Sequence, residues 1–397
     1  MTSKDTAKLA FRFVLILGVV NLFADMTYEG GRGLAGPFLG SLGASATAVG
    51  FVAGFGELIG YGLRSLTGYF ADKTHRYWAV SFIGYAVNLL AVPALALAGN
   101  WPAAAALIVL ERTGKAIRKP AVDAMLSHAG KSIGHGWVFG LNEALDQIGA
   151  TAGPLITALV LHWHGGFRHA FAVLLVPALL CLLTVALAAV LYPRPRELEE
   201  RQPRLLATRG FSPAYWRCAA GGALIAAGFA DFSLIAFHFQ KTAVVAQSMI
   251  PVFYAVAMAA GALASLVFGR LLDAVGRRVV WPAFLLGAMF GPLVFLGGSG
   301  LALAGMVLWG IGMGAQDSLL KAMLAGIVPP EKRGTAYGVF DTMFGAAWFA
   351  GSALMGFLYD RSLPALIAFS VLTQLSALPV LCGRIGPRGA NAGIAPK

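Results

Sequence analysis

The sequence predicts an all-α integral membrane protein with about twelve transmembrane helices, arranged as two pseudo-symmetric six-helix bundles. Of its 397 residues, 58% are hydrophobic and only 12% are charged, whereas soluble domains carry roughly 25% charged residues. The mean hydropathy is +0.74. The 50 glycines also fit a bilayer, where small residues let helices approach closely. This composition argues against a soluble enzyme.

Long apolar runs mark the expected helices, because about 20 mainly apolar residues are needed to cross a bilayer. A β-barrel is not expected, since no ten-residue stretches alternate between apolar and polar residues. The runs cover 11–40, 46–71, 78–99, 101–128, 138–162, 169–192, 213–240, 249–272, 279–297, 300–328, 334–358 and 363–383.

Basic residues gather in every second connection between these runs, and this asymmetry sets the expected orientation. If the N-terminus is cytoplasmic, the connections on the other side carry only Arg168, Lys241 and Arg361. The net charge of +12 then reflects membrane topology rather than a nucleic-acid partner. We therefore expect a multi-pass protein of a bacterial-type inner (plasma) membrane with both termini in the cytoplasm.

The chain divides into two related halves. A polar, proline-rich linker at 193–212 separates an N-terminal bundle, 1–192, from a C-terminal bundle with a short cytoplasmic tail, 213–397. The Ala-Met-Leu sequence at 124–126 recurs 198 positions later at 322–324. The same shift places Glu143 on Asp341 and Gly153 on Gly351, which predicts a duplicated six-helix unit.

A glycine, an aspartate four residues later and a basic loop follow the second predicted helix in each half. This paired motif resembles the major facilitator superfamily, which implies two bundles and alternating access. The resemblance also implies latches on the cytoplasmic side, with acidic partners from the opposite half. The gating residues expected from it are Gly68, Asp72, Arg76, Gly269, Asp273, Arg277, Arg278, Glu143 and Asp341.

The fifth predicted helix is similar to the antiporter branch of that superfamily. Gly140, Gly149, Gly153 and Pro154 have the spacing of the antiporter pattern, which implies proton-coupled efflux. A helix rich in glycine and kinked by proline suits a moving gate. Ordinary packing of small residues between helices is the alternative interpretation.

Charged residues within the apolar runs are candidates for proton coupling or substrate binding, because each costs at least about 2.5 kcal/mol at bilayer depth. Steps of four and three residues place Asp25, Glu29 and Arg32 on one face of the first helix. Asp25 recurs in the second half as Asp231, and the same shift places His238 opposite Arg32. A fully satisfied structural ion cluster is the alternative.

Glu57 lies near mid-depth of the second helix, and the fourth helix is unusually basic. It carries Arg112, Lys115 and Arg118. We expect Arg112 to neutralise Asp25 or Glu57, and the family resemblance links this arginine to proton coupling. Arg118 lies toward the cytoplasm, where a structural latch is the favoured interpretation.

Together these features predict a secondary active transporter that moves a small organic solute by alternating access, through proton-coupled efflux by antiport. Proton-coupled uptake of an anionic metabolite is the alternative, because the fourth helix is so basic. A lipid transporter or scramblase, or a polytopic membrane enzyme, is the alternative of another class.

The expected partners are a small-molecule substrate, protons and the lipid bilayer, with no nucleic acid, and we expect a functional monomer. We expect no catalytic residue, cofactor or metal. The cysteines at 181, 218 and 382 stand singly, and no nucleotide-binding or hydrolase motif occurs.

Overall fold

The computed structural model describes residues 3–74, 76–133, 135–193, 210–329 and 333–382. Within these ranges the chain is helical and contains no strand. The elements are α1 (Ser3–Ser41), α2 (Ala46–Thr74), α3 (Tyr77–Ala94), η1 (Leu95–Leu97), α4 (Trp101–Ile133), α5 (His135–His164), α6 (Phe167–Val173), α7 (Leu175–Leu191), α8 (Pro213–Gly228), α9 (Phe232–Thr242), η3 (Gln247–Met249), α10 (Ile250–Val275), η4 (Gly276–Val279), α11 (Val280–Ala288), α12 (Phe290–Leu296), α13 (Ser299–Ala315), the π-helical turn η5 (Gln316–Leu320), α14 (Lys321–Ile327), α15 (Arg333–Arg361) and α16 (Leu363–Cys382).

Eleven helical segments of the described chain are long and apolar enough to cross a membrane. The helix α4 makes a twelfth segment by length, with 33 residues, but it carries too many charges between Glu111 and Lys119 to qualify by composition. The predicted fold class is therefore confirmed. Because the charges of α4 cannot face lipid, they must find partners inside the protein.

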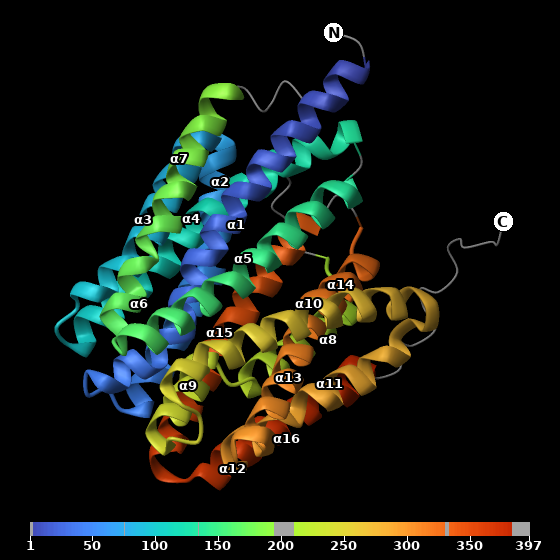
Figure 1. Ribbon diagram of the computed structural model, residues 1–397. Coiled ribbons are helices and arrows are strands. Elements are labelled where there is room, and N and C mark those ends of the chain that lie inside the picture. The colour runs from blue at the N-terminus through green and yellow to red at the C-terminus, as the bar shows by residue number, and fades with distance from the viewer. Residues whose placement is uncertain (1–2, 75, 134, 194–209, 330–332, 383–397) are drawn as a thin grey trace.

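The N-terminal half contains α1 to α7, and the C-terminal half contains α8 to α16 (Figure 1). The helix pairs α2–α15, α1–α9 and α5–α10 join them. We call the side of the membrane from which α1 starts the terminal side, and the side where α1 ends at Ser41 the far side. Figure 1 shows the bundles meeting near α9 and spreading apart toward the start of α1.

The longest contact between the halves runs along α2 and α15. At the far side, the backbone N–H and the hydroxyl of Thr47 donate to Asp360 at 2.8 and 2.7 Å. Deeper in the membrane, Gly54 lies against Ser352. Closer to the terminal side, Arg64 of α2 and Asp341 of α15 form an ion pair at 3.9 Å. The halves are therefore closed on the far side.

Equivalent glycines pack equivalent helices in the two halves. A Cβ atom on Gly153 of α5 would overlap the carbonyl oxygen of Met26 on α1. A Cβ on its repeat mate, Gly351 of α15, would overlap the carbonyl oxygen of Ala227 on α8. Gly149 contacts the backbone of Leu22 in the same way. Close helix packing thus accounts for these two glycines of the antiporter-like pattern.

The run expected at 213–240 is not one continuous helix. The helix α8 ends at Gly228, and α9 begins at Phe232, with Asp231 as its N-cap. One oxygen of Asp231 accepts a hydrogen bond from the backbone N–H of Ser233 at 2.8 Å. A carboxylate is favoured here by the partial positive charge of the helix start.

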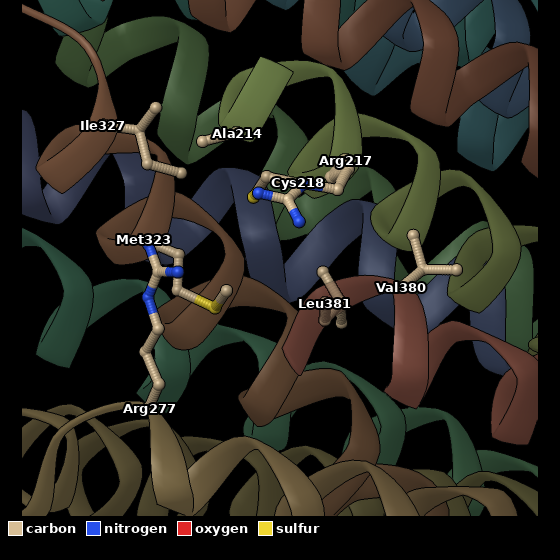
Figure 2. A pocket seen from close by; sticks show the side chains of 8 residues that line it. All are labelled: Ala214, Arg217, Cys218, Arg277, Met323, Ile327, Val380 and Leu381. Atoms are coloured by element: carbon tan, nitrogen blue, oxygen red, sulfur yellow. The ribbon is translucent and has the colours of Figure 1, made fainter. Parts of the chain in front are cut away.

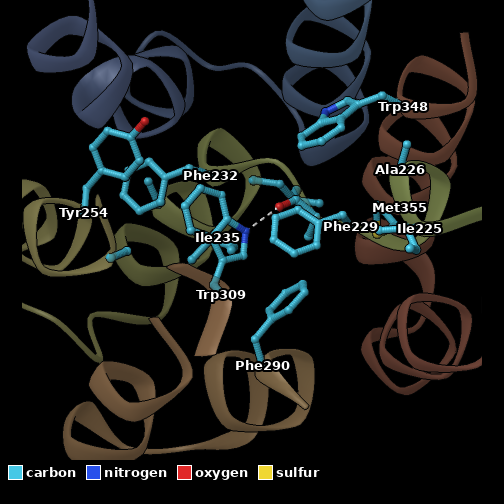
Figure 3. Packing of buried hydrophobic residues seen from close by; sticks show 14 of the residues in the cluster. Ile225, Ala226, Phe229, Phe232, Ile235, Tyr254, Phe290, Trp309, Trp348 and Met355 are labelled. Atoms are coloured by element: carbon cyan, nitrogen blue, oxygen red, sulfur yellow. Dashed lines mark hydrogen bonds between the residues drawn. The ribbon is translucent and has the colours of Figure 1, made fainter. Parts of the chain in front are cut away.

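The break is stable inside the membrane because the backbone carbonyl groups it frees have partners, as a bilayer interior requires. The indole N–H of Trp309 donates to Ala230 O at 2.9 Å, within the cluster of buried aromatic side chains in Figure 3. Ser370 and Gln374 donate to Gly228 O at 2.6 and 3.0 Å. No sequence period signals such a break, since it depends on donors from α13 and α16.

We predict that Gly153→Ala destabilises the protein by about 1–3 kcal/mol, because the added methyl group overpacks the contact of α5 with α1. Gly62→Ala is the matched control: a Cβ there meets no atom within 4 Å. It should be neutral or stabilising by up to about 1 kcal/mol, since alanine favours the helix. Thermal unfolding in detergent checks this, and equal midpoints for the two variants would contradict it.

Candidate functional site: a buried ionic cluster between the halves

Buried and half-buried charges of α1, α2 and α4 come together at mid-membrane, where they meet the N-cap of α9. We call this group the ionic cluster. Its members are Asp25, Glu29, Arg32, Glu57, Glu111, Arg112, Lys115, Arg118 and Asp231. Eight of them are the acidic and basic candidates of the sequence analysis, and Glu111 is the addition.

Arg32 links the two halves. Its guanidinium donates to Glu57 of α2 at 3.0 Å and to Asp231 of α9 at 3.0 Å. The side chains of Arg32 and Asp231 are 10% and 2% exposed, so water does little to screen this pair. The break between α8 and α9 is what places Asp231 within reach, because the carboxylate projects from a helix start.

Glu57 is shared between two arginines. Besides Arg32, Arg112 of α4 lies 3.5 Å from the same carboxylate oxygen. Arg112 also lies 3.4 Å from Glu111, which accepts a hydrogen bond from Asn88 of α3 at 2.8 Å. Arg112 therefore neutralises Glu57 and not Asp25, the other partner that the sequence allowed.

Arg118 turns inward, so the expectation of a cytoplasmic latch at this residue is wrong. It lies 3.8 Å from Asp25 and donates to Asn88 at 3.2 Å. Its guanidinium also stacks on the ring of Tyr85, 4.6 Å from the centroid. The aromatic face and the carboxylate together compensate a charge that apolar surroundings would otherwise exclude.

Glu29 and Lys115 are the two cluster members with no partner of opposite charge within 4.0 Å among the described residues. Glu29 instead accepts a short hydrogen bond from the hydroxyl of Tyr254 on α10, in the other half. The ammonium of Lys115 lies over the ring of Tyr28, 3.9 Å from the centroid. These two are therefore the charges of the ionic cluster that are not held in a described ion pair.

A chain of buried polar side chains extends the cluster toward the terminal side, and the sequence analysis missed it. Tyr85 donates to Asn21 at 2.6 Å, Asn21 donates to Asn142 at 2.7 Å, and Asn142 donates to Asp146 at 3.2 Å. The other oxygen of Asp146 is buried with no hydrogen-bond partner. The sequence does contain one sign of this polar chain: Asn21 is a polar residue one turn before Asp25 on the same helix face.

His238 does not belong to the cluster, contrary to the sequence expectation. It is buried on the far side, with Nδ1 2.9 Å from the hydroxyl of Tyr359 and its ring against Phe295. The break before Phe232 changes the direction of the chain, so the repeat shift does not carry the position of Arg32 onto His238.

The expected gating residues are placed differently from the sequence-based picture. Asp341 contacts Arg64 of the opposite half rather than the basic loop at Arg76. Glu143 is exposed and accepts from Gln147 of its own helix at 2.9 Å. The side chains of Asp72 and Asp273 lie outside the described residues.

Gly269 and Arg277 are the motif positions of the second half that the structure describes most fully. A Cβ on Gly269 would meet nothing within 4 Å, so this glycine does not serve close contact. The exposed Arg277 points toward Arg217 across a small pocket beside Met323 (Figure 2). That cavity is about 10 Å³, the space of about one water, and is too small for an organic solute.

The arrangement of the helices in two halves agrees with what known proteins of similar sequence and structure show. The family model of the Major Facilitator Superfamily matches residues 17–255 and 220–387. The chain belongs to the Major Facilitator Superfamily. An uncharacterized protein of Mycobacterium tuberculosis is 38% identical over 387 residues, covering 96% of this chain and 95% of the relative. An uncharacterized MFS-type transporter of Methanocaldococcus jannaschii is 24% identical over 383 residues, or 93% and 94% of the two chains.

Solved structures of the superfamily share the fold at low identity. The nucleoside transporter NupG has a TM-score of 0.74 at 14% identity, covering 94% of this chain and 100% of that one. A bacterial homolog of the human lysosomal transporter Spinster has a TM-score of 0.67 at 15% identity, covering 94% of each chain. This superfamily member is therefore a membrane transporter of small molecules and not an enzyme.

We predict that Arg32→Gln or Asp231→Asn alone destabilises the protein by about 3–5 kcal/mol, because each leaves a buried charge without its partner. The double variant should cost less than the sum, with a coupling energy of about 1–3 kcal/mol. Denaturant unfolding in detergent measures the cycle. The control Lys321→Gln removes one member of an exposed pair and should change stability by at most about 0.5 kcal/mol. Strictly additive effects would contradict the cross-half ion pair.

Proposed function

We propose that this transporter is proton-coupled and that Glu29 takes up the proton. The observation that carries the proposal is its hydrogen bond from Tyr254 across the halves, with no described cation within 4.0 Å. Glu29 is thus the cluster carboxylate that an uncharged donor of the other half holds in place. The other cluster carboxylates each face an arginine within 4.0 Å.

Protonation of Glu29 acts on a contact between the halves. While Glu29 is ionised, Tyr254 donates a charge-assisted hydrogen bond, which is roughly twice as strong as a neutral one. Uptake of a proton weakens this bond and so weakens the closure of the far side. The conformational equilibrium then shifts toward the state that is open to the far side. A bound proton, like any ligand, favours the state that binds it more tightly.

Export of a small organic solute in exchange for protons is the direction we propose. The resemblance of the α5 glycine pattern to that of antiporters supports it, and Gly149 and Gly153 pack this helix against Leu22 and Met26, on either side of Asp25. A bend of α5 at Pro154 then moves the segment of α1 that carries the acidic residues. Both termini lie in the cytoplasm in this proposal, so the far side is the extracytoplasmic one.

We predict that Glu29→Gln abolishes the effect of pH on the distance between the halves. Spin labels at Thr74 and Gly326, on the terminal ends of α2 and α14, report that distance. In the wild type, acidification should shorten it, because the far side opens and the terminal side closes. The variant carries a neutral side chain and should show the acidic distribution at every pH.

The control for this experiment is Glu143→Gln, which neutralises an exposed acid of α5. It should respond to pH as the wild type does. A Glu29→Gln variant that keeps the full response would overturn the assignment of the proton to Glu29. If the pH response persists in Glu29→Gln but disappears in Asp146→Asn, the proton is assigned to Asp146 instead.

Proton-coupled uptake of an organic anion is the second candidate, and Lys115 favours it. This ammonium is the cluster cation without a carboxylate within 4.0 Å in the described chain. Glu29, Asp25 and Glu57 are the acids whose electrostatic influence reaches it. When Glu29 is protonated, an anion at Lys115 has less negative charge to oppose it, so proton and anion bind together.

We predict for this candidate that Lys115→Gln abolishes the thermal stabilisation that small carboxylates give the purified protein, while Lys115→Arg keeps part of it. Amines of matched shape should stabilise neither variant. If instead amines stabilise the wild type and carboxylates do not, export of a cationic solute is supported and anion uptake is rejected.

A further inference from the structure

Each half carries an ion pair on the terminal side, and the two pairs have opposite polarity. On α4, Lys119 lies 3.2 Å from Asp123. On the segment η5–α14, Asp317 lies 3.6 Å from Lys321. The 198-residue shift of the repeat places Asp317 on Lys119 and Lys321 on Asp123. Where one half has a base, the other has an acid.

Both pairs lie near the point where contact between the halves ends. Asp341, the acid of the pair with Arg64, is within electrostatic range of Asp123 from one half and of Asp317 and Lys321 from the other. Lys119 and Asp123 are 35% and 43% exposed, and the other two residues are each 60% exposed. Neither pair is therefore enclosed by the opposite half in this structure.

The symmetry of the fold brings such residues toward each other. Bundles of this kind are related by a two-fold axis along the membrane normal, and residues near a two-fold axis face their own equivalents. Identical charges at these positions would repel when the halves approach on the terminal side. The opposite charges at 119 and 317, and at 123 and 321, attract instead.

We propose that these four residues exchange partners during the transport cycle. With the bundles spread apart on the terminal side, as in Figure 1, each pair forms within its own helix. When the terminal side closes, Lys119 pairs with Asp317, and Asp123 pairs with Lys321. Each charge keeps a partner in both states, so the exchange adds little to the barrier while it gives the closed gate its register. This rests on alternating access and not on proton coupling.

Charge reversal tests the exchange. Lys119→Asp and Asp317→Lys each turn one attraction into a repulsion within a helix and one across the gate, so each alone should change the population with the terminal side closed by less than about twofold. The double variant restores opposite charges across the gate but leaves like charges within both helices. It should therefore raise the population with the terminal side closed above the wild-type value by about two- to fivefold, as measured with the spin labels at Thr74 and Gly326.

A reversal at an exposed far-side residue, Arg361→Glu, is the control and should leave that population unchanged. If only the pairs within the helices matter, each single variant will already raise the closed population and the double variant will show the sum of the two effects, which overturns the exchange. A single distance population in the wild type would overturn it together with alternating access. A short cross-linker that joins cysteines at 119 and 317, and fails to join them at 119 and 360, would support it.

Discussion

The structure depends on one constraint: ionised side chains inside a membrane must be compensated by other parts of the protein. Arg32 shows how this constraint organises the fold. Its two carboxylate partners, Glu57 and Asp231, come from different halves, so satisfying one buried charge holds the halves in register. The break between α8 and α9 serves the same need, because it turns Asp231 into a helix cap aimed at Arg32.

The packing between the halves follows from small residues rather than from apolar burial. Lipid is as apolar as the helix surfaces, so close backbone contact must supply the attraction. Gly54 lets α2 approach α15, and Gly153 and Gly351 do the same for equivalent helix pairs inside each half. Large side chains also meet across α2 and α15: Phe51 and Phe55 pack against Phe349, and Tyr61 packs against Phe344.

The cluster combines fully paired charges with two groups that are not paired. Asp25, Glu57, Glu111 and Asp231 are held by arginines and set a fixed geometry. Glu29 and Lys115 have no partner of opposite charge within 4.0 Å among the described residues, and Glu29 is hydrogen-bonded to Tyr254 of the opposite half. In the proposed mechanism the paired charges form a rigid scaffold, and the contact of Glu29 with the opposite half changes the balance between states.

The sequence by itself determined the helical membrane fold, the repeat and the charged faces of α1 and α4, because helical period and the cost of charge in a bilayer are local properties. Only the tertiary structure decided the pairing. It joined Arg118 to Asp25, bonded Glu29 to Tyr254 and left His238 outside the cluster. These outcomes depend on the break before Phe232 and on which helices lie side by side, and no spacing along the chain encodes the distance between two helices.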